Sequence, residues 1–271
     1  MDYIKLGTSG FSFKDWKGVL YQDNIKPEKM FSVYTEYFDT VEINSTYYRI
    51  PPKRVFETLN DQTSDQFEFV IKLNKESTHD RKKSQEAIES LIESVSPMLK
   101  SEKLKGFLAQ FPYSFKNTSF NRKYLIEMKS DCRDIPVIVE FRNKSWINDA
   151  VYDFLDRQNI NYCCVDEPEL DGLISPQSVV TGDLGYVRFH GKNSITWWDS
   201  SKGDRYDYLY SEKELSDWLQ RIREIGMKSS KTYLFFNNCH AGHAVKNAAM
   251  MAKLLENQFS LKTLLKELPV N

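Results

Sequence analysis

The run Val137-Ile138-Val139-Glu140-Phe141-Arg142 is apolar and rich in β-branched residues until it ends in charged side chains. In a β-strand, alternate residues lie on the same face. One face of this run is therefore wholly apolar, whereas the other carries Glu140 and Arg142 at its late end. The pattern predicts a buried strand whose apolar face packs on helices and whose carboxyl end presents polar side chains.

Similar runs recur along the chain, and amphipathic segments long enough for three or more helical turns separate most of them. Strand alternating with helix predicts parallel pairing, and eight such units fit the usual length of a closed barrel, about 250 residues. We therefore expect an α/β fold, a (β/α)8 TIM barrel with a closed parallel sheet, forming one domain over residues 1–271. The expected strands are Ile4–Ser9, Thr40–Asn44, Phe67–Leu73, Phe107–Phe111, Val137–Phe141, Tyr162–Val165, Tyr186–His190 and Thr232–Phe236. Helices are expected within Pro27–Phe38, Ser84–Leu99, Asn148–Gln158 and Glu212–Ile225.

An open, doubly wound sheet is the alternative architecture. Its dinucleotide-binding version needs three glycines in the first turn, and Leu6-Gly7-Thr8-Ser9-Gly10-Phe11 lacks the third. The barrel is therefore favoured. The charged segment 74–83 is predicted to be a mobile flap rather than a domain boundary.

Composition bears on the partners and the cellular location expected for the protein. With 37 basic and 38 acidic residues, the net charge of −1 gives no overall attraction to a polyanion or an anionic membrane. No basic leader or long apolar stretch is present, so neither a signal peptide nor a membrane span is expected. The four cysteines, Cys132, Cys163, Cys164 and Cys239, form no CxxC pair, and they are predicted to be buried thiols of a cytoplasmic protein.

Polar side chains also end the other strands, by the same alternation. The residues expected to face the barrel interior with Glu140 and Arg142 are Glu42, Asn44, Lys72, Gln110, Asp166, Arg188 and His190. Burying an unpaired charge costs several kcal/mol, so we expect these groups to pair with one another around a solvated pocket. Barrel enzymes keep their active sites at this end.

The cations Lys72, Arg142 and Arg188 suit a phosphate or carboxylate, which predicts a small anionic ligand. Alternatively they only neutralise the neighbouring carboxylates. His190 is expected to shuttle a proton near neutrality. Glu140 and Asp166 are expected to orient or activate water, with Glu42 as a further catalytic candidate.

Other residues are predicted to contact the ligand. Asn237 and Asn238 precede the last helix, where backbone amides can bind an anion. Trp197 and Trp198 are predicted to form a platform for stacking on a base or sugar. Asn44, Gln110 and His79 complete the predicted binding set.

No cofactor and no metal ligand is predicted. The alternative is Mg²⁺ or Mn²⁺ held by Glu42, Glu140, Asp166 and His190. The neighbouring arginines oppose that alternative by charge repulsion.

Several ordered motifs resemble the YecE-like family, catalogued as domain of unknown function 72. They include Gly7-Thr8-Ser9-Gly10-Phe11, Val41-Glu42-Ile43-Asn44-Ser45-Thr46-Tyr47-Tyr48, Gln110-Phe111-Pro112, Val187-Arg188-Phe189-His190-Gly191 and Phe236-Asn237-Asn238. The resemblance spans nearly the whole chain and implies a barrel fold, but no established activity. One departure is Asn143, where relatives usually carry histidine.

The leading hypothesis is an enzyme with hydrolase or lyase chemistry on a phosphorylated nucleotide or sugar. A non-catalytic module that binds an anion or a nucleic-acid end is the first alternative. A divalent-metal-dependent phosphodiesterase or isomerase is the second, and a scaffold with a plugged barrel is the third. The sequence predicts no oligomeric state.

Overall fold

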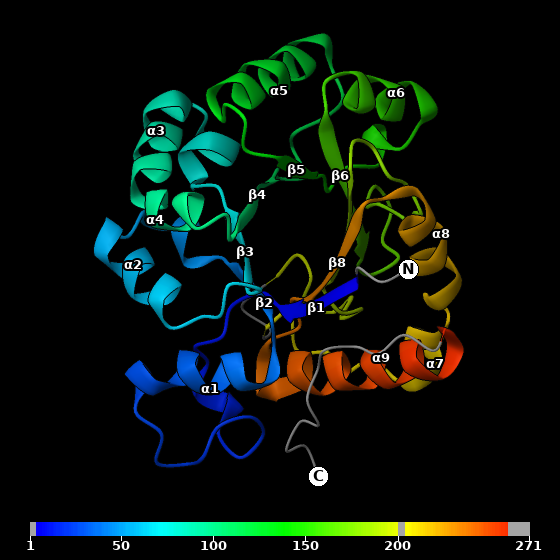
Figure 1. Ribbon diagram of the computed structural model, residues 1–271. Helices are drawn as coiled ribbons and strands as arrows, with labels where there is room; N and C mark the ends of the chain where they lie inside the picture. Colours follow the sequence, from blue (N-terminus) through cyan, green and yellow to red (C-terminus); the bar gives the residue numbers. More distant parts are fainter. Residues whose placement is uncertain (1–3, 200–203, 260–271) are drawn as a thin grey trace.

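Eight parallel strands form a ring with helices around it (Figure 1). The computed structural model describes residues 4–199 and 204–259. In sheet order the strands are β1 (Ile4–Thr8), β8 (Lys231–Phe236), β7 (Leu184–Phe189), β6 (Ile160–Asp166), β5 (Val137–Glu140), β4 (Leu104–Gln110), β3 (Glu68–Lys72) and β2 (Thr40–Ile43). The predicted TIM barrel is thereby confirmed.

The barrel closes where β1 meets β2, and this seam has little ladder pairing. A single parallel bridge joins Ser9 to Glu42. The Tyr34 hydroxyl completes the seam, because it accepts from Thr8 N at 3.2 Å and donates to Thr40 O at 2.9 Å. Gly7 permits the close approach, since a Cβ there would lie 2.8 Å from Thr40 O.

Helices cover the outer face of the ring (Figure 1). They are α1 (Met30–Tyr37), α2 (Lys53–Asp61), α3 (Ser84–Ser94), α4 (Ser96–Lys100), α5 (Ser119–Asp131), α6 (Asp149–Arg157), α7 (Glu212–Ser216), α8 (Leu219–Lys228) and α9 (His243–Phe259). α6 illustrates why they form: Asn148 caps its first turn, and Val151, Phe154 and Leu155 bury one stripe against the sheet.

Short helical turns lie in the connections between these elements. The 3₁₀ turns are η1 (Lys14–Trp16), η2 (Pro27–Lys29), η3 (Ser45–Tyr47), η5 (Lys144–Trp146) and η7 (His240–Gly242), and η4 (Glu76–Asp80) is a π-turn. η4 lies in the segment predicted to be a mobile flap. It buries Ser77 and Thr78, so the segment is a packed turn rather than an open flap.

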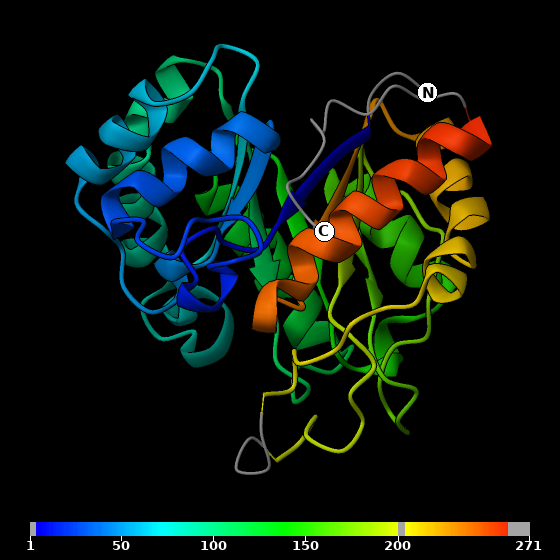
Figure 2. The same cartoon turned by 90° about the horizontal axis from the view of Figure 1, so that it is seen from below.

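Some predicted boundaries are wrong. The segment predicted as one helix over Ser84–Leu99 breaks at Val95 into α3 and α4, because Pro97 lies in the first turn of α4. β4 begins at Leu104, earlier than the predicted Phe107. Among the described residues no helix connects β6 to β7; the 167–183 connection contains Pro168 and Pro176. Figure 2 shows the connections after β6 and β7 extending beyond the carboxyl ends of the strands.

The two ends of the barrel interior carry separate polar groups. At the amino-terminal end, Glu68 accepts a hydrogen bond from the Tyr233 hydroxyl at 2.8 Å and pairs with Lys231. The second group, at the carboxyl ends of the strands, is the candidate site described below. Within the described residues, no helix has the length and apolar character needed to cross a membrane.

Replacing Tyr34 with phenylalanine tests the closure of the seam. The change leaves Thr8 N and Thr40 O buried without a partner, so we expect the free energy of unfolding to fall by about 1–3 kcal/mol. Urea unfolding at pH 7.5 measures the change. Tyr152→Phe is the matched control: its hydroxyl contacts Gln177 Oε1 at 3.3 Å near the surface, and we expect a change below about 0.5 kcal/mol. Equal losses in the two variants would show that Tyr34 has no special role in closure.

Candidate functional site

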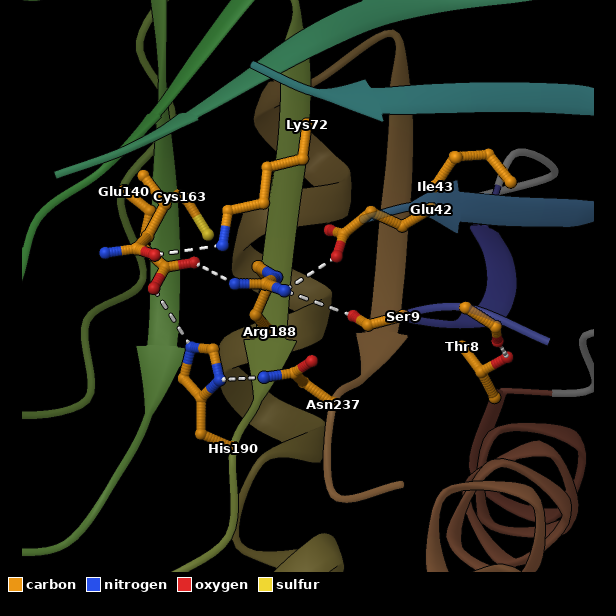
Figure 3. A network of polar contacts seen from close by, with 12 residues as sticks. Thr8, Ser9, Glu42, Ile43, Lys72, Glu140, Cys163, Arg188, His190 and Asn237 are labelled. Atoms are coloured by element: carbon orange, nitrogen blue, oxygen red, sulfur yellow. Dashed lines mark hydrogen bonds and ion pairs between the residues drawn. The ribbon is translucent and has the colours of Figure 1, made fainter. Parts of the chain in front are cut away.

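Arg188 of β7 lies at the centre of the site (Figure 3). Its guanidinium donates to Glu140 Oε2 at 2.5 Å and to Glu42 Oε1 at 2.6 Å, and it also reaches Ser9 Oγ at 3.2 Å. These partners come from β5, β2 and the end of β1, so one side chain joins strands on opposite sides of the barrel. Arg188 is only 1% exposed, and both carboxylates are fully buried. Such a charge is tolerated only because it is paired on two sides.

The two carboxylates are held by further groups. Glu42 Oε2 accepts from the Tyr186 hydroxyl at 2.7 Å. Glu140 Oε1 lies 2.6 Å from Arg142 Nη2. The neighbouring Arg142 and Arg188 hold the pKa of Glu140 well below its usual range, against the effect of burial. Glu42 and Glu140, two of the candidate catalytic carboxylates, are therefore bound to guanidinium groups.

A further buried carboxylate, Glu167, lies one residue beyond β6. Its Oε2 accepts from Arg142 Nη1 at 2.6 Å, and its Oε1 accepts from the backbone N–H of Ile174 at 3.0 Å. Burial raises the pKa of Glu167 to about 7, with Arg142 acting in the opposite direction. The predicted alternation places Asp166 on the inner face, and its neighbour Glu167 is therefore left out of the predicted site.

His190 is a fully buried, neutral ring. The amide Nδ2 of Asn237 lies 3.0 Å from its Nδ1. On the other side of the ring, Nε2 lies 3.2 Å from both Arg142 Nη2 and Glu140 Oε1. Burial, assisted by the charge of Arg142, lowers the pKa of His190 to about 3. Burial therefore favours the neutral ring at pH 7 and opposes the predicted role of His190 as a proton shuttle near neutrality.

Lys72 at the end of β3 has a different environment from the arginines. Its Nζ donates to Gln110 Oε1 at 3.0 Å and lies 4.7 Å from the centre of the Tyr47 ring. Burial, followed by the positive charge of Arg188, lowers the pKa of the Lys72 ammonium to about 8. Lys72 is thus a cation in the site that can lose its proton near neutral pH.

A cavity of about 1020 Å³ opens at this end of the barrel. Residues predicted from the sequence that line it are Asn44, Lys72, His79, Gln110, Arg142, Arg188, Trp197, Trp198 and Asn237. Glu42, Glu140 and His190 are buried behind this lining. The cavity therefore presents the cations to a ligand and hides the carboxylates paired with them.

Asp166 and Asn238 are corrections to the predicted site. Asp166 accepts a hydrogen bond from the Trp218 indole N–H and lies 3.9 Å from Lys192, so it faces the helix layer rather than the barrel interior. Cys163 lies in the interior network instead (Figure 3). Asn238 is fully buried, and its amide donates to Tyr208 O at 2.9 Å and Asn247 Oδ1 at 2.8 Å. It anchors the loop to α9, away from the cavity.

The predicted tryptophan platform separates into two different roles. Trp197 is 2% exposed, and its ring lies under Arg142 and Arg205, 5.4 and 5.9 Å from their guanidinium carbons. Trp198 is 56% exposed and meets Tyr113 edge to face, with 5.2 Å between ring centres. Trp197 thus supports the cations, and Trp198 belongs to the rim.

In the loop before α9, the backbone N–H of the strained residue already has a partner within the protein. The residue Ala241 has a positive φ of 49°, and its N–H donates to Asp15 Oδ2 at 2.5 Å. A carboxylate of the protein itself therefore occupies the amide that we expected an anion to use. Asn143, the departure from the family pattern, caps η5 by accepting from Ser145 N at 3.0 Å, and it does not line the cavity.

Sequence analysis also missed Ser9, Arg205 and Tyr206, which line the cavity. Ser9 follows β1 directly, whereas the other two lie in the long connection after β7, where no periodic pattern marks position. No group of three or more His, Cys, Asp or Glu residues within 4–199 and 204–259 is placed to hold a metal ion. The carboxylates considered for Mg²⁺ or Mn²⁺ are those already bonded to arginine or tryptophan.

Comparison with known proteins gives consistent matches along the chain. A family model described as "Protein of unknown function DUF72" matches residues 5–270. The chain is 30% identical over 274 residues to the UPF0759 protein YunF of Bacillus subtilis, covering 95% of this chain and 96% of YunF. A DUF72 family protein of Thermotoga maritima MSB8 is 38% identical, with a TM-score of 0.86 over 94% of this chain and 99% of that one. Another, from Enterococcus faecalis V583, is 27% identical with a TM-score of 0.85, over 93% and 95% of the two chains.

Replacing Arg188 with methionine tests whether the buried network supports the fold. The change strands Glu42 and Glu140 without their shared cation, so we expect the free energy of unfolding to fall by about 3–5 kcal/mol. Chemical denaturation followed by circular dichroism measures the loss. Lys144→Met is the control, because it breaks an ion pair with Asp171 of similar length, 2.7 Å, at the surface; we expect its unfolding midpoint to be unchanged. A stable Arg188→Met protein would contradict this role.

His190 should make the protein less stable in mild acid. Its folded pKa of about 3 lies below the unfolded value of 6.5, so the unfolded chain binds more protons between these limits and stability falls with pH across this window. His190→Gln removes this contribution. We subtract the free energy of unfolding of the parent from that of the variant at each pH. This difference should be about 2 kcal/mol more favourable to the variant at pH 5 than at pH 8. Because the comparison uses one protein pair at two pH values, other titrating groups largely cancel. His240→Gln at the exposed rim is the control. An unchanged difference for His190→Gln would show that the ring titrates alike in the folded and unfolded protein, which would contradict the lowered pKa.

Proposed function

This chain belongs to the DUF72 family, and we propose that it is an enzyme that binds a phosphorylated nucleotide or sugar at the mouth of its barrel. Hydrolase or lyase chemistry fits the groups present. The observation that carries the proposal is the separation of charge around the cavity. Cations line it, whereas the carboxylates that pair with them are buried behind.

The positive side of this separation has four members. Lys72, Arg142, Arg188 and Arg205 line the cavity. Arg188 uses its two terminal nitrogens for Glu140 and Glu42, and Arg142 uses its own for Glu167 and Glu140. Lys72 and Arg205 are therefore the cations best suited to contact an anion. Arginine forks and a lysine ammonium are the side chains that bind phosphate most often.

Two carboxylates also line the cavity, but backbone amides already engage them. Asp15 accepts from Ala241 N, and Asp204 accepts from Tyr206 N at 2.8 Å. Asp204 additionally lies 3.8 Å from His240 Nδ1 at the rim. The inner part of the cavity is therefore more positive than its edge, which favours a ligand that enters with its charged group first.

The rim suits the uncharged part of a sugar or nucleotide. Tyr48 is 79% exposed and Trp198 56% exposed, and both line the cavity mouth. Exposed rings of this kind stack on sugars and bases. Asn44 adds a polar contact: its buried Oδ1 accepts no hydrogen bond from any described residue, and a ligand hydroxyl would satisfy it.

Lys72 fits the role of general acid or base better than His190 does. A general acid or base works best when its pKa lies near the working pH. Lys72, with a pKa of about 8, meets this condition and lines the cavity, whereas His190 does neither. His79 also lines the cavity, and burial lowers the pKa of its ring to about 4, so it can only accept a proton at neutral pH.

A non-catalytic module for the end of a nucleic acid is the second candidate, and the exposure of Tyr48 and Trp198 favours it. Binding of this kind weakens steeply as salt is raised, because phosphate contacts release counterions. A bound oligonucleotide recovered unchanged after long incubation would favour this candidate over an enzyme.

Replacing Lys72 with methionine tests the proposal. Methionine keeps the length of the chain but removes a charged donor worth about 1.5–3 kcal/mol, so we expect AMP and ribose 5-phosphate to bind about tenfold or more weakly. Titration calorimetry with AMP, ribose 5-phosphate, adenosine and ribose measures affinity and the preference for phosphate. Lys123→Met is the matched control, since Lys123 has a side chain that is 77% exposed on α5. The proposal fails if the parent protein binds none of these compounds, or binds adenosine and ribose as tightly as their phosphates.

A further inference from the structure

In the part of the chain that the structure describes, Lys72 is a cavity-lining cation with no carboxylate at salt-bridge distance from its Nζ. Within the described residues its Nζ has one hydrogen-bond acceptor, Gln110 Oε1. An ammonium has three N–H donors, so two are unused by these residues. Glu140 and Glu42 are near enough to favour its charge, but each is bonded to arginine instead.

A second buried lysine, which has a structural role, provides a comparison for Lys72. Lys103 is 4% exposed. Its Nζ donates to Asn60 O at 3.1 Å, Thr63 O at 3.0 Å and Thr63 Oγ1 at 3.0 Å. All three donors of Lys103 are satisfied, so its charge is stabilised in place. Lys72 has neither this set of acceptors nor a salt bridge.

The positive charges of Arg142 and Arg188 favour loss of a proton from Lys72. A guanidinium does not deprotonate in a protein, whereas an amine does. Two positive charges close to a poorly paired ammonium favour its neutral form, as does burial. A lysine beside another cationic group is one of the known ways to obtain an uncharged, nucleophilic amine.

The position of the amine also fits attack on a ligand. Lys72 lies at the carboxyl end of β3 and extends into the barrel interior towards Arg188 (Figure 3). The Tyr47 ring covers one side of the amine at 4.7 Å, and Lys72 remains a lining residue of the cavity. A ligand whose anionic group contacts Arg205 enters the same cavity as this amine.

We propose that Lys72 forms a Schiff base with the carbonyl carbon of a phosphorylated aldehyde or ketone, such as the open-chain form of a sugar phosphate. This inference rests on the proposed function, because the phosphate is what selects the ligand. It narrows that function from hydrolase or lyase chemistry to lyase chemistry on a carbonyl compound.

The reaction balances without an oxidant or reductant. The neutral amine adds to the carbonyl carbon, forming a C–N bond, and the carbonyl oxygen takes up a proton. The resulting hydroxyl leaves as water after a second protonation, with one amine proton returned to solvent. The iminium so formed accepts the electron pair of a bond broken at the neighbouring carbon. The other fragment leaves as an aldehyde or ketone, and its hydroxyl proton goes to solvent. The enamine that remains takes up a proton at the neighbouring carbon, which regenerates the iminium, and addition of water then releases the product and restores Lys72.

Two probes that differ only in phosphate test this inference in the full-length protein. Pyridoxal 5′-phosphate and pyridoxal each carry an aldehyde, and borohydride reduction fixes any Schiff base as a stable secondary amine. Peptide mass spectrometry then locates the modified lysine. The ordinary lysine pKa is 10.5 and that of Lys72 about 8; at pH 7.5 its neutral fraction exceeds that of an exposed lysine on the order of a hundredfold. The lower nucleophilicity that accompanies a lower pKa reduces the rate advantage to about tenfold.

We expect Lys72 to be modified about tenfold faster than surface lysines such as Lys123. Lys103 is the buried control and should remain unmodified. Lys72→Met should lose the fast phase, and inorganic phosphate should slow it in the parent protein. Modification spread over surface lysines, with Lys72 unmodified by either probe, would overturn the inference.

The outcomes also separate this inference from the proposed function. Calorimetry that shows phosphate binding while Lys72 stays unmodified removes the Schiff base and leaves the anion site. Equal rates with pyridoxal and its phosphate, unaffected by inorganic phosphate, keep the reactive amine but remove the proposed phosphate selectivity. Faster reaction of the phosphorylated probe at Lys72 supports both.

Discussion

The buried guanidinium of Arg188, held by Glu42 on one side and Glu140 on the other, is the interaction on which the rest of the site depends. It joins β7 to β2 and β5 at 2.6 and 2.5 Å, with almost no contact with solvent. Desolvating three charges is costly, so each must keep its partner. Because both carboxylates are bonded to Arg188, the nearby ammonium of Lys72 pairs with neither of them. It donates to Gln110 Oε1 instead.

The arginines and the lysine of the site, although all are cationic side chains, therefore have different roles. Arginines act as fixed cations that hold carboxylates: Arg188 joins strands, and Arg142 connects Glu140 to Glu167 beyond β6. Lysine is the group free to change protonation state. The long connection after β7 adds Trp197 beneath Arg142, which ties the loop to the buried network. Paired arginines, Lys72 and exposed aromatic side chains thus line one cavity.

Alternation along strands was enough to predict the barrel and the inward position of Glu42, Glu140 and Arg188, because a period of two is a local property. It failed for Asp166, whose direction is set by the Trp218 indole, a partner distant in sequence. The neutral state of His190 depends on burial and on Arg142, which no local pattern reveals. Trp197 and Trp198 are adjacent in sequence yet lie in different environments, because they occupy a loop without periodicity.

The central claim is that pairing of the arginines leaves Lys72 with a readily lost proton. Nuclear magnetic resonance of the lysine side chains, with Lys72 assigned by its absence in a methionine variant, measures this directly as a function of pH. The account predicts a midpoint for Lys72 at about pH 8, well below those of the exposed lysines. A midpoint at the ordinary lysine value of 10.5 would contradict the account, because it would mean that Lys72 is stabilised as a cation like any surface lysine.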